Sequence, residues 1–285
     1  MRNTILNSIW QILTVTLVSL TVTSCGDAEP SKNKLAEAKK TSNKLKMFER
    51  LASSETGVKF ANTLSPEQEL VFYDFQYQFN GGGVGVADFD NDGLQDIFFT
   101  GNEVSNKLYK NLGNLKFEDV TEKAGVGQEG FWCNGITIID INNDGLQDIY
   151  ISRGGFMPRE KRKNSLLINK GNFQFEEKAD EFGIADTGYT TQSAFLDFDQ
   201  DGDLDLVVNN VNQVAQIYQN NSTNNYIGFQ LKYEGQNIDA IGAKVRVYLG
   251  EEILLKEQIP SRGFQSSVDD KLLFGLGDQE QIEKI

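Results

Sequence analysis

The chain has 285 residues, of which 39% are hydrophobic and 11% aromatic, so it is long and apolar enough to bury a core. It carries 41 acidic and 27 basic residues and a net charge of −14, which disfavours nucleic acid and anionic membrane surfaces as direct partners. It contains no histidine, which excludes the Ser-His-Asp triad, the Cys-His dyad and histidine-ligated zinc. No glycine-rich phosphate-binding motif of the P-loop or dinucleotide type is present either.

The N-terminus has the pattern of an export signal. Arg2 precedes an apolar stretch over residues 5–22, and the sequence Val22-Thr-Ser-Cys25 closes it. This resembles the signal peptide of a bacterial lipoprotein, whose cysteine becomes the lipidated first residue of the mature chain; a plain secretory signal and a membrane helix are the alternatives. We therefore expect residues 1–24 to be a signal peptide, Cys25 to carry the lipid, and the polar residues 25–46 to form a flexible tether.

The same resemblance implies an exported protein that is lipid-anchored to a bacterial membrane, at the outer membrane or cell surface. Gly26, in place of the aspartate linked to inner-membrane retention in some bacteria, favours the outer membrane. With Cys25 acylated, Cys133 would have no disulfide partner. We expect Cys133, which lies just before a predicted strand, to be a buried and inert thiol rather than a nucleophile.

A nine-residue pattern occurs three times. The copies are Asp88-Phe-Asp-Asn-Asp-Gly-Leu-Gln-Asp96, Asp140-Ile-Asn-Asn-Asp-Gly-Leu-Gln-Asp148 and Asp197-Phe-Asp-Gln-Asp-Gly-Asp-Leu-Asp205. Each places oxygen-bearing side chains at positions 1, 3, 5 and 9 and a glycine at position 6, where a sharp turn is needed. Ca²⁺ takes about six to eight oxygen ligands, and alternating residues of a tight loop can supply them, together with the backbone carbonyl of position 7.

The pattern therefore predicts about three Ca²⁺ ions. The predicted ligands are Asp88, Asp90, Asp92, Leu94 and Asp96 in the first loop, Asp140, Asn142, Asp144, Leu146 and Asp148 in the second, and Asp197, Asp199, Asp201, Asp203 and Asp205 in the third. The loops hold four, three and five aspartates, which account for nearly all of the excess negative charge. Mg²⁺ fits this pattern less well, because it demands a smaller and stricter octahedron.

Two other interpretations of the loops were weighed. A single Asp/Asn/Gly-rich stretch is often an ordinary hairpin turn, but three copies of one pattern argue against that. An EF-hand needs a glutamate at position 12 between amphipathic helices, whereas position 12 here is Phe99, Ile151 or Val208. The flanking runs are short, β-branched and aromatic, so we expect each loop to join two strands.

The repeat extends beyond the loops. Each unit of about 50 residues contains several short strand-like runs with a period of two, which is the pattern of a propeller blade. Over roughly residues 70–222 the chain resembles the FG-GAP/VCBS repeats of integrin-α-like β-propellers, in which the Ca²⁺ loop joins the first two strands of a blade. Residues 241–247, 261–267 and 273–277 resemble the ASPIC/UnbV domain, which follows such propellers in relatives of cartilage acidic protein.

The predicted fold is therefore all-β, with propeller-type blades over residues 47–225 and a small β module over residues 226–285. Propellers close with about four to eight blades, whereas three units are evident, so we expect a truncated or internally shortened propeller. It is expected either to be open or to complete itself with the C-terminal module. The C-terminal module is also expected to be truncated, since the chain stops at Ile285 within a strand-like run.

The predicted function is a non-enzymatic, calcium-binding module that binds a protein or glycan or acts as a scaffold at the cell surface. The alternative is a glycan hydrolase or lyase, because paired carboxylates can cleave sugars without histidine. The carboxylates outside the loops that could serve this purpose are expected to face solvent; they are Glu118, Asp119, Glu176 and Glu177.

A third hypothesis is an adhesion site between the strands. Arg153, Phe156 and Arg159 could anchor a partner, because arginine and aromatic residues dominate binding energies at interfaces. Phe131 and Trp132 lie in a similar position, but core packing explains them better. This hypothesis predicts that Arg153→Ala weakens binding of the partner without lowering stability.

Overall fold

The computed structural model describes residues 47–65, 79–261, 263 and 266–285. Internal contacts divide the chain into a unit over residues 1–49 and a unit over residues 50–285. The predicted signal peptide, Cys25 and the tether lie outside the described residues. Among the described residues, no helix is long and apolar enough to cross a membrane.

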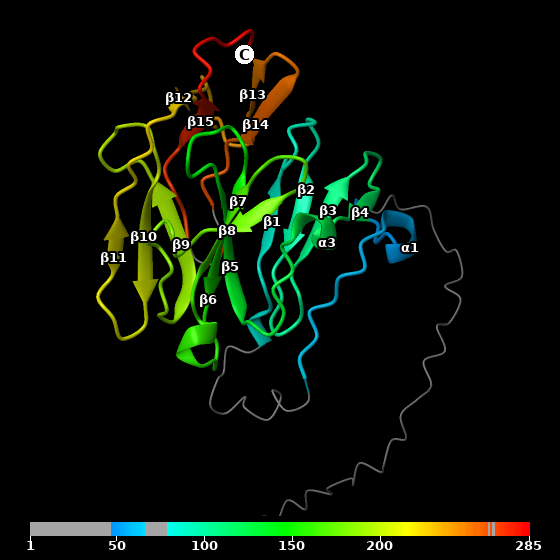
Figure 1. Ribbon diagram of the computed structural model, residues 1–285. Helices are drawn as coiled ribbons and strands as arrows, with labels where there is room; N and C mark the ends of the chain where they lie inside the picture. The colour runs from blue at the N-terminus through cyan, green and yellow to red at the C-terminus, as the bar shows by residue number, and fades with distance from the viewer. Residues whose placement is uncertain (1–46, 66–78, 262, 264–265) are drawn as a thin grey trace, which may run out of the picture. The chain divides into compact units, whose positions relative to one another are not determined.

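Residues 84–218 form three antiparallel sheets in chain order (Figure 1). The first consists of β1 (Val84–Ala87), β2 (Asp96–Phe99), β3 (Lys107–Asn111) and β4 (Phe117–Asp119). The second consists of β5 (Cys133–Ile139), β6 (Asp148–Arg153), β7 (Ser165–Asn169) and β8 (Phe175–Glu177). The third consists of β9 (Thr190–Leu196), β10 (Asp205–Asn210) and β11 (Gln216–Tyr218). The all-β prediction and the blade-like repeat are confirmed, although the third sheet has three strands rather than four.

Each aspartate-rich loop joins the first two strands of its sheet. The strand pairs end in register on either side of the loop, with Ala87 opposite Asp96 in the first sheet. Ile139 lies opposite Asp148 in the second, and position 1 of each loop follows the strand directly. The EF-hand is thereby excluded for these loops, because strands rather than helices flank them. The helical elements among the described residues are short: α1 (Ser53–Thr56), α3 (Thr121–Ala124) and the 3₁₀ turn η2 (Arg159–Lys161).

The sheets pack face to face through two apolar clusters. The cluster between the first and second sheets contains Phe98, Leu108 and Ile149, each fully buried. The cluster between the second and third contains Leu166 and Phe195. Alternate residues of a strand point to opposite faces, so each sheet has a forward face toward the next sheet and a back face toward the preceding one.

A repeated hydrogen bond joins neighbouring sheets at their loop ends. The Asn169 side chain donates through Nδ2 to the Phe89 carbonyl of the preceding sheet at 2.8 Å. One sheet later, Asn220 donates in the same way to the Ile141 carbonyl at 2.7 Å. Both asparagines also bond to a carbonyl within their own loop, namely that of Gln147 or Leu204. The asparagine at or just after the end of the third strand of a sheet therefore fixes the spacing to the sheet before it.

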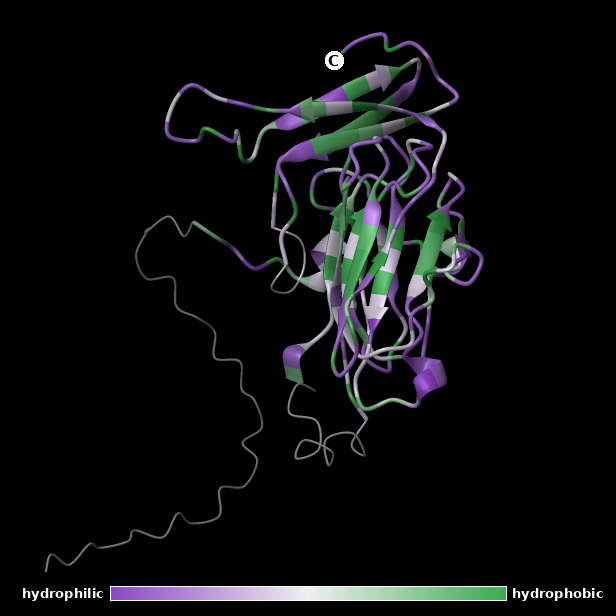
Figure 2. Ribbon diagram, turned by 90° about the vertical axis from the view of Figure 1, so that its left-hand side faces the viewer, coloured by the Kyte–Doolittle hydropathy of each residue, from purple (hydrophilic) through white to green (hydrophobic). Residues whose placement is uncertain are grey.

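The C-terminal module has its own strands and its own core. They are β12 (Asn225–Gln230), β13 (Lys244–Leu249), β14 (Glu252–Glu257) and β15 (Lys271–Gly277). β12 pairs with β15 and β13 with β14, both antiparallel. Val247, Leu254 and Phe274 are buried in a cluster separate from those between the blades. Apolar and polar residues alternate over the first four residues of β13, whereas β15 is a nearly continuous apolar run that is buried over residues 272–276, and Figure 2 shows apolar bands along these strands.

The segment that precedes the first sheet packs on it without forming a strand over residues 50–65. The Phe60 ring stacks on Phe99 with a centroid distance of 5.1 Å. The side chain of Asn62 and the side chain and backbone of Asn102 form two hydrogen bonds of 2.7 and 2.8 Å. This segment therefore covers part of the back face of the first sheet.

Asn169→Ala should lower the free energy of unfolding by about 2 kcal/mol, because it removes the side-chain donor to the buried Phe89 carbonyl and to the partly buried Gln147 carbonyl. Urea unfolding followed by far-UV circular dichroism measures the change. Asn221→Ala is the matched control, since Asn221 is exposed and its side chain makes one long bond of 3.4 Å to a neighbouring carbonyl. Equal stability of the two variants would contradict a structural role for the asparagine.

Candidate metal centre

The three loops form a continuous row. Asn91 at position 4 of the first loop donates through Nδ2 to the Gly145 carbonyl of the second loop at 3.4 Å. Asn143, at the same position in the second loop, donates to the Gly202 carbonyl of the third loop at 3.1 Å. Both asparagines have a positive φ, 57° and 56°, which asparagine tolerates better than most residues and which aims the side chain at the next loop.

The first loop gathers three carboxylates around a lysine. Oxygen atoms of Asp88, Asp90 and Asp92 all lie within 4.8 Å of one another. Lys110 of β3 places its Nζ against Asp90 and at 2.8 Å from Asp92 Oδ2. The Oδ1 atom of Asp90 is buried and has no hydrogen-bond partner within the described residues. The loop is therefore built around a positive charge, and it retains an oxygen that could serve as a metal ligand.

The third loop repeats this arrangement with a different lysine. Asp197, Asp199 and Asp201 again bring carboxylate oxygens within 4.8 Å of one another. Lys271 of the C-terminal module lies with its Nζ at 2.5 Å from Asp197 Oδ2. Asp203 at position 7 is also buried, and its Oδ1 has no partner in the described part of the chain. Two of the loops thus present clusters that could hold a metal ion.

The second loop is different because position 3 is an asparagine. The Asn142 amide donates to Asp144 Oδ2 at 2.9 Å, which satisfies a potential ligand oxygen internally. Asp140 accepts the backbone N–H groups of Asp144 and Gly145 at 3.0 Å each, and Gly275 of the C-terminal module donates to it at 3.2 Å. The oxygens that the sequence predicted as ligands are therefore more fully used here than in the other two loops.

Position 9 of the loops has a role that its spacing did not predict. Asp96 accepts the N–H of Phe89 at 3.0 Å through one oxygen and that of Asn111 at 2.7 Å through the other. The equivalents Asp148 and Asp205 make the same two kinds of bond with their own loop and third strand. The carboxylate at position 9 therefore clamps the hairpin to the third strand, and it is not part of the clusters of positions 1, 3 and 5.

Burial raises the proton affinity of several of these carboxylates. Desolvation raises the pKa of Asp88 to about 6 and that of Asp96 to about 7, despite backbone hydrogen bonds that favour the charged forms. Desolvation likewise raises the pKa of Asp140 to about 6 and of Asp203 to about 6. Negative charge is thus concentrated where it is poorly solvated, and a bound cation would relieve that cost.

The C-terminal module is attached to the loops. Besides Lys271 on Asp197 and Gly275 on Asp140, the Gly277 N–H donates to the Asn143 carbonyl at 2.8 Å. Because β15 supplies all three residues, one strand of the module spans the second and third loops.

The prediction that Arg153 anchors an external partner is wrong. It is buried, with 4% exposure, and its guanidinium donates to the Lys163 carbonyl at 2.8 Å and to Gln128 Oε1 at 2.6 Å. It also stacks on the Phe131 ring at 3.9 Å. An external partner therefore has no access to it, and Arg153→Ala is expected to lower stability, contrary to the sequence-based prediction. Trp132 is buried, with 2% exposure, as core packing predicts.

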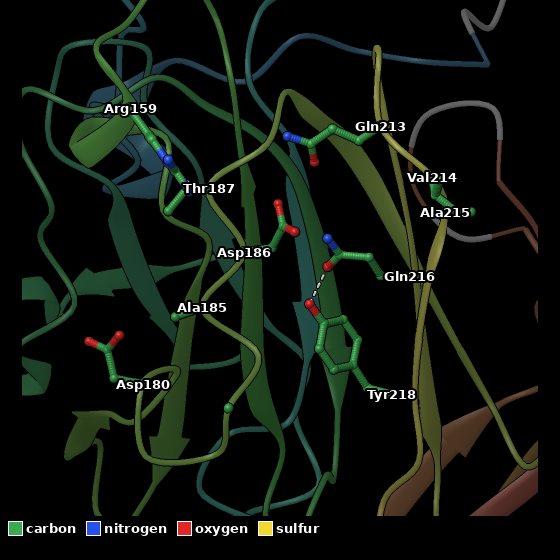
Figure 3. A pocket seen from close by; sticks show the side chains of 11 residues that line it. Arg159, Asp180, Ala185, Asp186, Thr187, Gln213, Val214, Ala215, Gln216 and Tyr218 are labelled. Atoms are coloured by element: carbon green, nitrogen blue, oxygen red, sulfur yellow. Dashed lines mark hydrogen bonds between the residues drawn. The ribbon is translucent and has the colours of Figure 1, made fainter.

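Phe156 and Arg159 remain at the surface. Phe156 is 61% exposed, and Arg159 lines a groove of about 750 Å³ beside β11 (Figure 3). The groove lies next to the outer edge of the third sheet, along which no fourth strand pairs among the described residues. Asp186 and the hydrogen-bonded pair Gln216 and Tyr218 contribute polar groups to its wall.

The other residues singled out from the sequence lie where they were expected. Cys133 is fully buried, and burial raises the pKa of its thiol, so it is an inert core residue. The four carboxylates proposed for a glycosidase all lie exposed on the outermost strands β4 and β8; they are Glu118, Asp119, Glu176 and Glu177.

Lys110→Met should strengthen metal binding in the first loop by about tenfold, because the ammonium competes with the ion for Asp90 and Asp92. The same change should destabilise the metal-free protein, since it leaves the carboxylates uncompensated. Isothermal titration with CaCl₂ measures the first effect and urea unfolding the second. Lys107→Met is the control, because Lys107 pairs with Asp119 outside the loops; similar affinities of the two variants would contradict the competition.

The stability of the metal-free protein should fall as the pH rises from about 4 to about 7. Asp88 and Asp96 have folded-state pKa values of about 6 and about 7, against about 4 in the unfolded chain. The folded state therefore binds more protons in this window, and deprotonation favours unfolding. Urea unfolding of the metal-stripped protein at several pH values tests this. Stability that rises steadily across the window would contradict it.

Comparisons with known proteins agree with this architecture. A family model described as an FG-GAP-like repeat matches residues 88–151 and 156–208, and a model described as ASPIC and UnbV matches residues 233–285. Cartilage acidic protein 1 of Xenopus tropicalis is 28% identical over 132 residues, which are 46% of this chain and 20% of that protein. The chain thus aligns with about a fifth of that relative's length. The chain contains FG-GAP-like repeats and a C-terminal ASPIC and UnbV domain.

Proposed function

We propose that this protein is a calcium-stabilised, non-enzymatic binding scaffold at a bacterial cell surface. The observation that carries the proposal is the row of three loops, two of which gather three carboxylates each, joined loop to loop by Asn91 and Asn143. The ligand set consists of oxygen only, which suits Ca²⁺ and not the softer transition metals. Calcium would hold the loop ends of neighbouring blades at fixed spacing.

The energetic argument rests on the lysines. In the first and third loops a single ammonium faces a cluster of carboxylates, so the lysine compensates the negative charge only in part. Ca²⁺ would add two positive charges and bind several oxygens at once. Buried oxygens without a partner, Asp90 Oδ1 and Asp203 Oδ1, are the kind of atom that an ion would satisfy. The second loop would bind most weakly, because Asn142 and the C-terminal module already occupy its oxygens.

Removal of calcium should lower the melting temperature. Extracellular calcium modules have dissociation constants of about 10⁻⁴–10⁻³ M, and at tenfold that concentration each site adds about 1.4 kcal/mol of stability. Differential scanning calorimetry with EGTA, then with excess Ca²⁺ or equal Mg²⁺, should show a loss that Ca²⁺ reverses and Mg²⁺ does not. An unmoved transition would count against structural calcium.

Single-loop variants assign the ions. Asp90→Ala and Asp199→Ala should each remove one Ca²⁺ per chain, measured by equilibrium dialysis with ⁴⁵Ca²⁺, because each deletes a carboxylate of one cluster. Glu118→Ala removes an exposed carboxylate outside the loops and should leave the count unchanged. A count that drops equally in all three variants would show non-specific binding to the acidic surface.

The scaffold would present its partner-binding surface away from the loops. The groove beside β11, with Arg159 and Asp186 in its lining, is polar and open, which suits a glycan or a polar protein segment. Its polar groups come from three separate segments of the chain, so calcium would preserve the groove indirectly by stabilising the blades. Glycan and protein array binding by the parent chain and Arg159→Ala, each with and without Ca²⁺, examines this; equal binding by both chains would exclude Arg159.

The surface location is proposed from the N-terminal sequence. The apolar stretch over residues 5–22 and Val22-Thr-Ser-Cys25 support lipidation at Cys25. Incorporation of labelled palmitate into the parent chain and not into Cys25→Ala would establish the anchor. We also propose a non-catalytic function, because the loop carboxylates would serve as clamps and ion ligands and the remaining candidate carboxylates are exposed on edge strands.

A further inference from the structure

The two outer faces of the row of sheets expose residues whose counterparts are buried between the sheets. On the back face of the first sheet, Val84 and Val86 are 58% and 55% exposed. Counting from position 1 of each loop, their counterparts in the second sheet are Ile136, which is 6% exposed, and Ile138, which packs in the same inter-sheet cluster. The back face of the first sheet therefore resembles the faces that are buried between sheets. Among the described residues, Val84 and Val86 remain largely uncovered on it.

The forward face of the third sheet shows the same property. Ile217 of β11 is 71% exposed, whereas its counterparts Leu108 and Leu166 are fully buried in the two inter-sheet clusters. Ala194 and Leu196 of β9 are half-buried on the same face. Apolar side chains stabilise a protein when they are buried, so exposed ones at these positions do not stabilise a terminal sheet.

At both ends of the row of sheets, residues are also present that correspond to one partner of the hydrogen bonds between neighbouring sheets. Asn111 donates to the Gln95 carbonyl of its own loop at 2.8 Å, as Asn169 and Asn220 donate to carbonyls of their own loops, but no sheet precedes it among the described residues. At the other end, Gln200 occupies position 4 with φ 63°, the conformation from which Asn91 and Asn143 reach the next loop.

The two ends are complementary to each other. A forward face meets a back face at both internal junctions, and the free faces are one of each kind. The first sheet offers the Asn111 side chain as donor and the Gly93 carbonyl as acceptor. The third sheet offers the Gln200 side chain as donor and the Phe198 carbonyl as acceptor. These are the groups that bond at the internal junctions, as the bonds of Asn91 to Gly145 and of Asn169 to Phe89 show.

We propose that two copies of this chain associate head to tail, the third sheet of each packing on the first sheet of the other, so that six blades close into one ring. Six lies within the range of about four to eight blades in which propellers close. A twofold axis through the ring then makes both new junctions equivalent, and each repeats the contacts of the internal ones. On the back face of the first sheet, the partner copy would contact Val84 and Val86 of β1, because Phe60 already covers Phe99 of β2.

The internal junctions indicate which residues meet. A Cβ placed on Gly85 of the forward face would lie 2.8 Å from Ile136 Cδ1 and 2.9 Å from Ile138 Cδ1 of the next sheet. Ala194 is the counterpart of Gly85 in the third sheet, and Val86 is the counterpart of Ile138 in the first. Across the new junction, Ala194 of one copy should therefore lie beside Val86 of the other, so these two positions are the pair to test by cysteine cross-linking. Within one chain these two residues face away from each other at opposite ends of the row.

The test is disulfide cross-linking of the full chain carrying Val86→Cys and Ala194→Cys, in mild detergent with Ca²⁺ present. A band of twice the chain mass on a non-reducing gel, absent from either single variant, is the expected result. Because both junctions of a ring link the same two copies, no larger species should form. The parent chain shows any background from Cys25, and Cys133 is fully buried.

Three outcomes would overturn the proposal. Failure to cross-link would mean that the faces are covered otherwise, a ladder of larger multiples would mean an open chain, and cross-linking by Val86→Cys alone would mean a contact between two first sheets. A further change tests the face itself: Ile217→Glu in the double-cysteine chain should reduce the cross-linked fraction several-fold. Ile238→Glu, equally apolar and 61% exposed but in the C-terminal module, should not.

Discussion

The clamp made by the aspartate at position 9 is the constraint on which the blades depend. Asp96, Asp148 and Asp205 each accept one N–H at the start of the loop and one at the end of the third strand. Each carboxyl group accepts one backbone N–H through each of its two oxygens, and these two hydrogen bonds fix three strands relative to one another. The clamp also positions the bond between neighbouring sheets. In the second and third repeats, the asparagine whose N–H is held by the clamp is the one whose side chain donates to the preceding sheet.

This arrangement is electrostatically unfavourable, because it brings negative charges together in the loops. The loops place carboxylates where burial raises their pKa, and the protein compensates with lysines drawn from elsewhere in the fold. Lys110 comes from the third strand of the same sheet, whereas Lys271 comes from the C-terminal module. The module is therefore an electrostatic partner of the blades as well as a separate apolar core. This dependence gives a physical reason for an ASPIC and UnbV domain to accompany FG-GAP-like repeats in one chain.

Face-to-face packing stabilises the interior of the row of sheets, but it leaves one face of each terminal sheet without a neighbouring sheet among the described residues. A repeat protein whose units bury both faces must cover the outer faces of its terminal units, and in the described part of this chain apolar residues remain exposed on both. Phe60 and Asn62 cover only part of the back face of the first sheet. A complementary copy would meet this requirement with contacts that the molecule already makes twice.

The sequence alone determined the local structure: the strand–loop–strand repeats, the positions of the oxygen-bearing side chains in the loops and the C-terminal module. Spacing within nine residues and a period of two suffice for this, because both depend on neighbouring residues. Only the tertiary structure decided which oxygens are free, which lysines face them, and that Arg153 is buried. These depend on partners far away in sequence, such as Gly275 on Asp140 across 135 positions, and spacing carries no information about such contacts. The clamp at position 9 lies between these cases, since one of its bonds is local and the other requires the third strand to pack beside the loop.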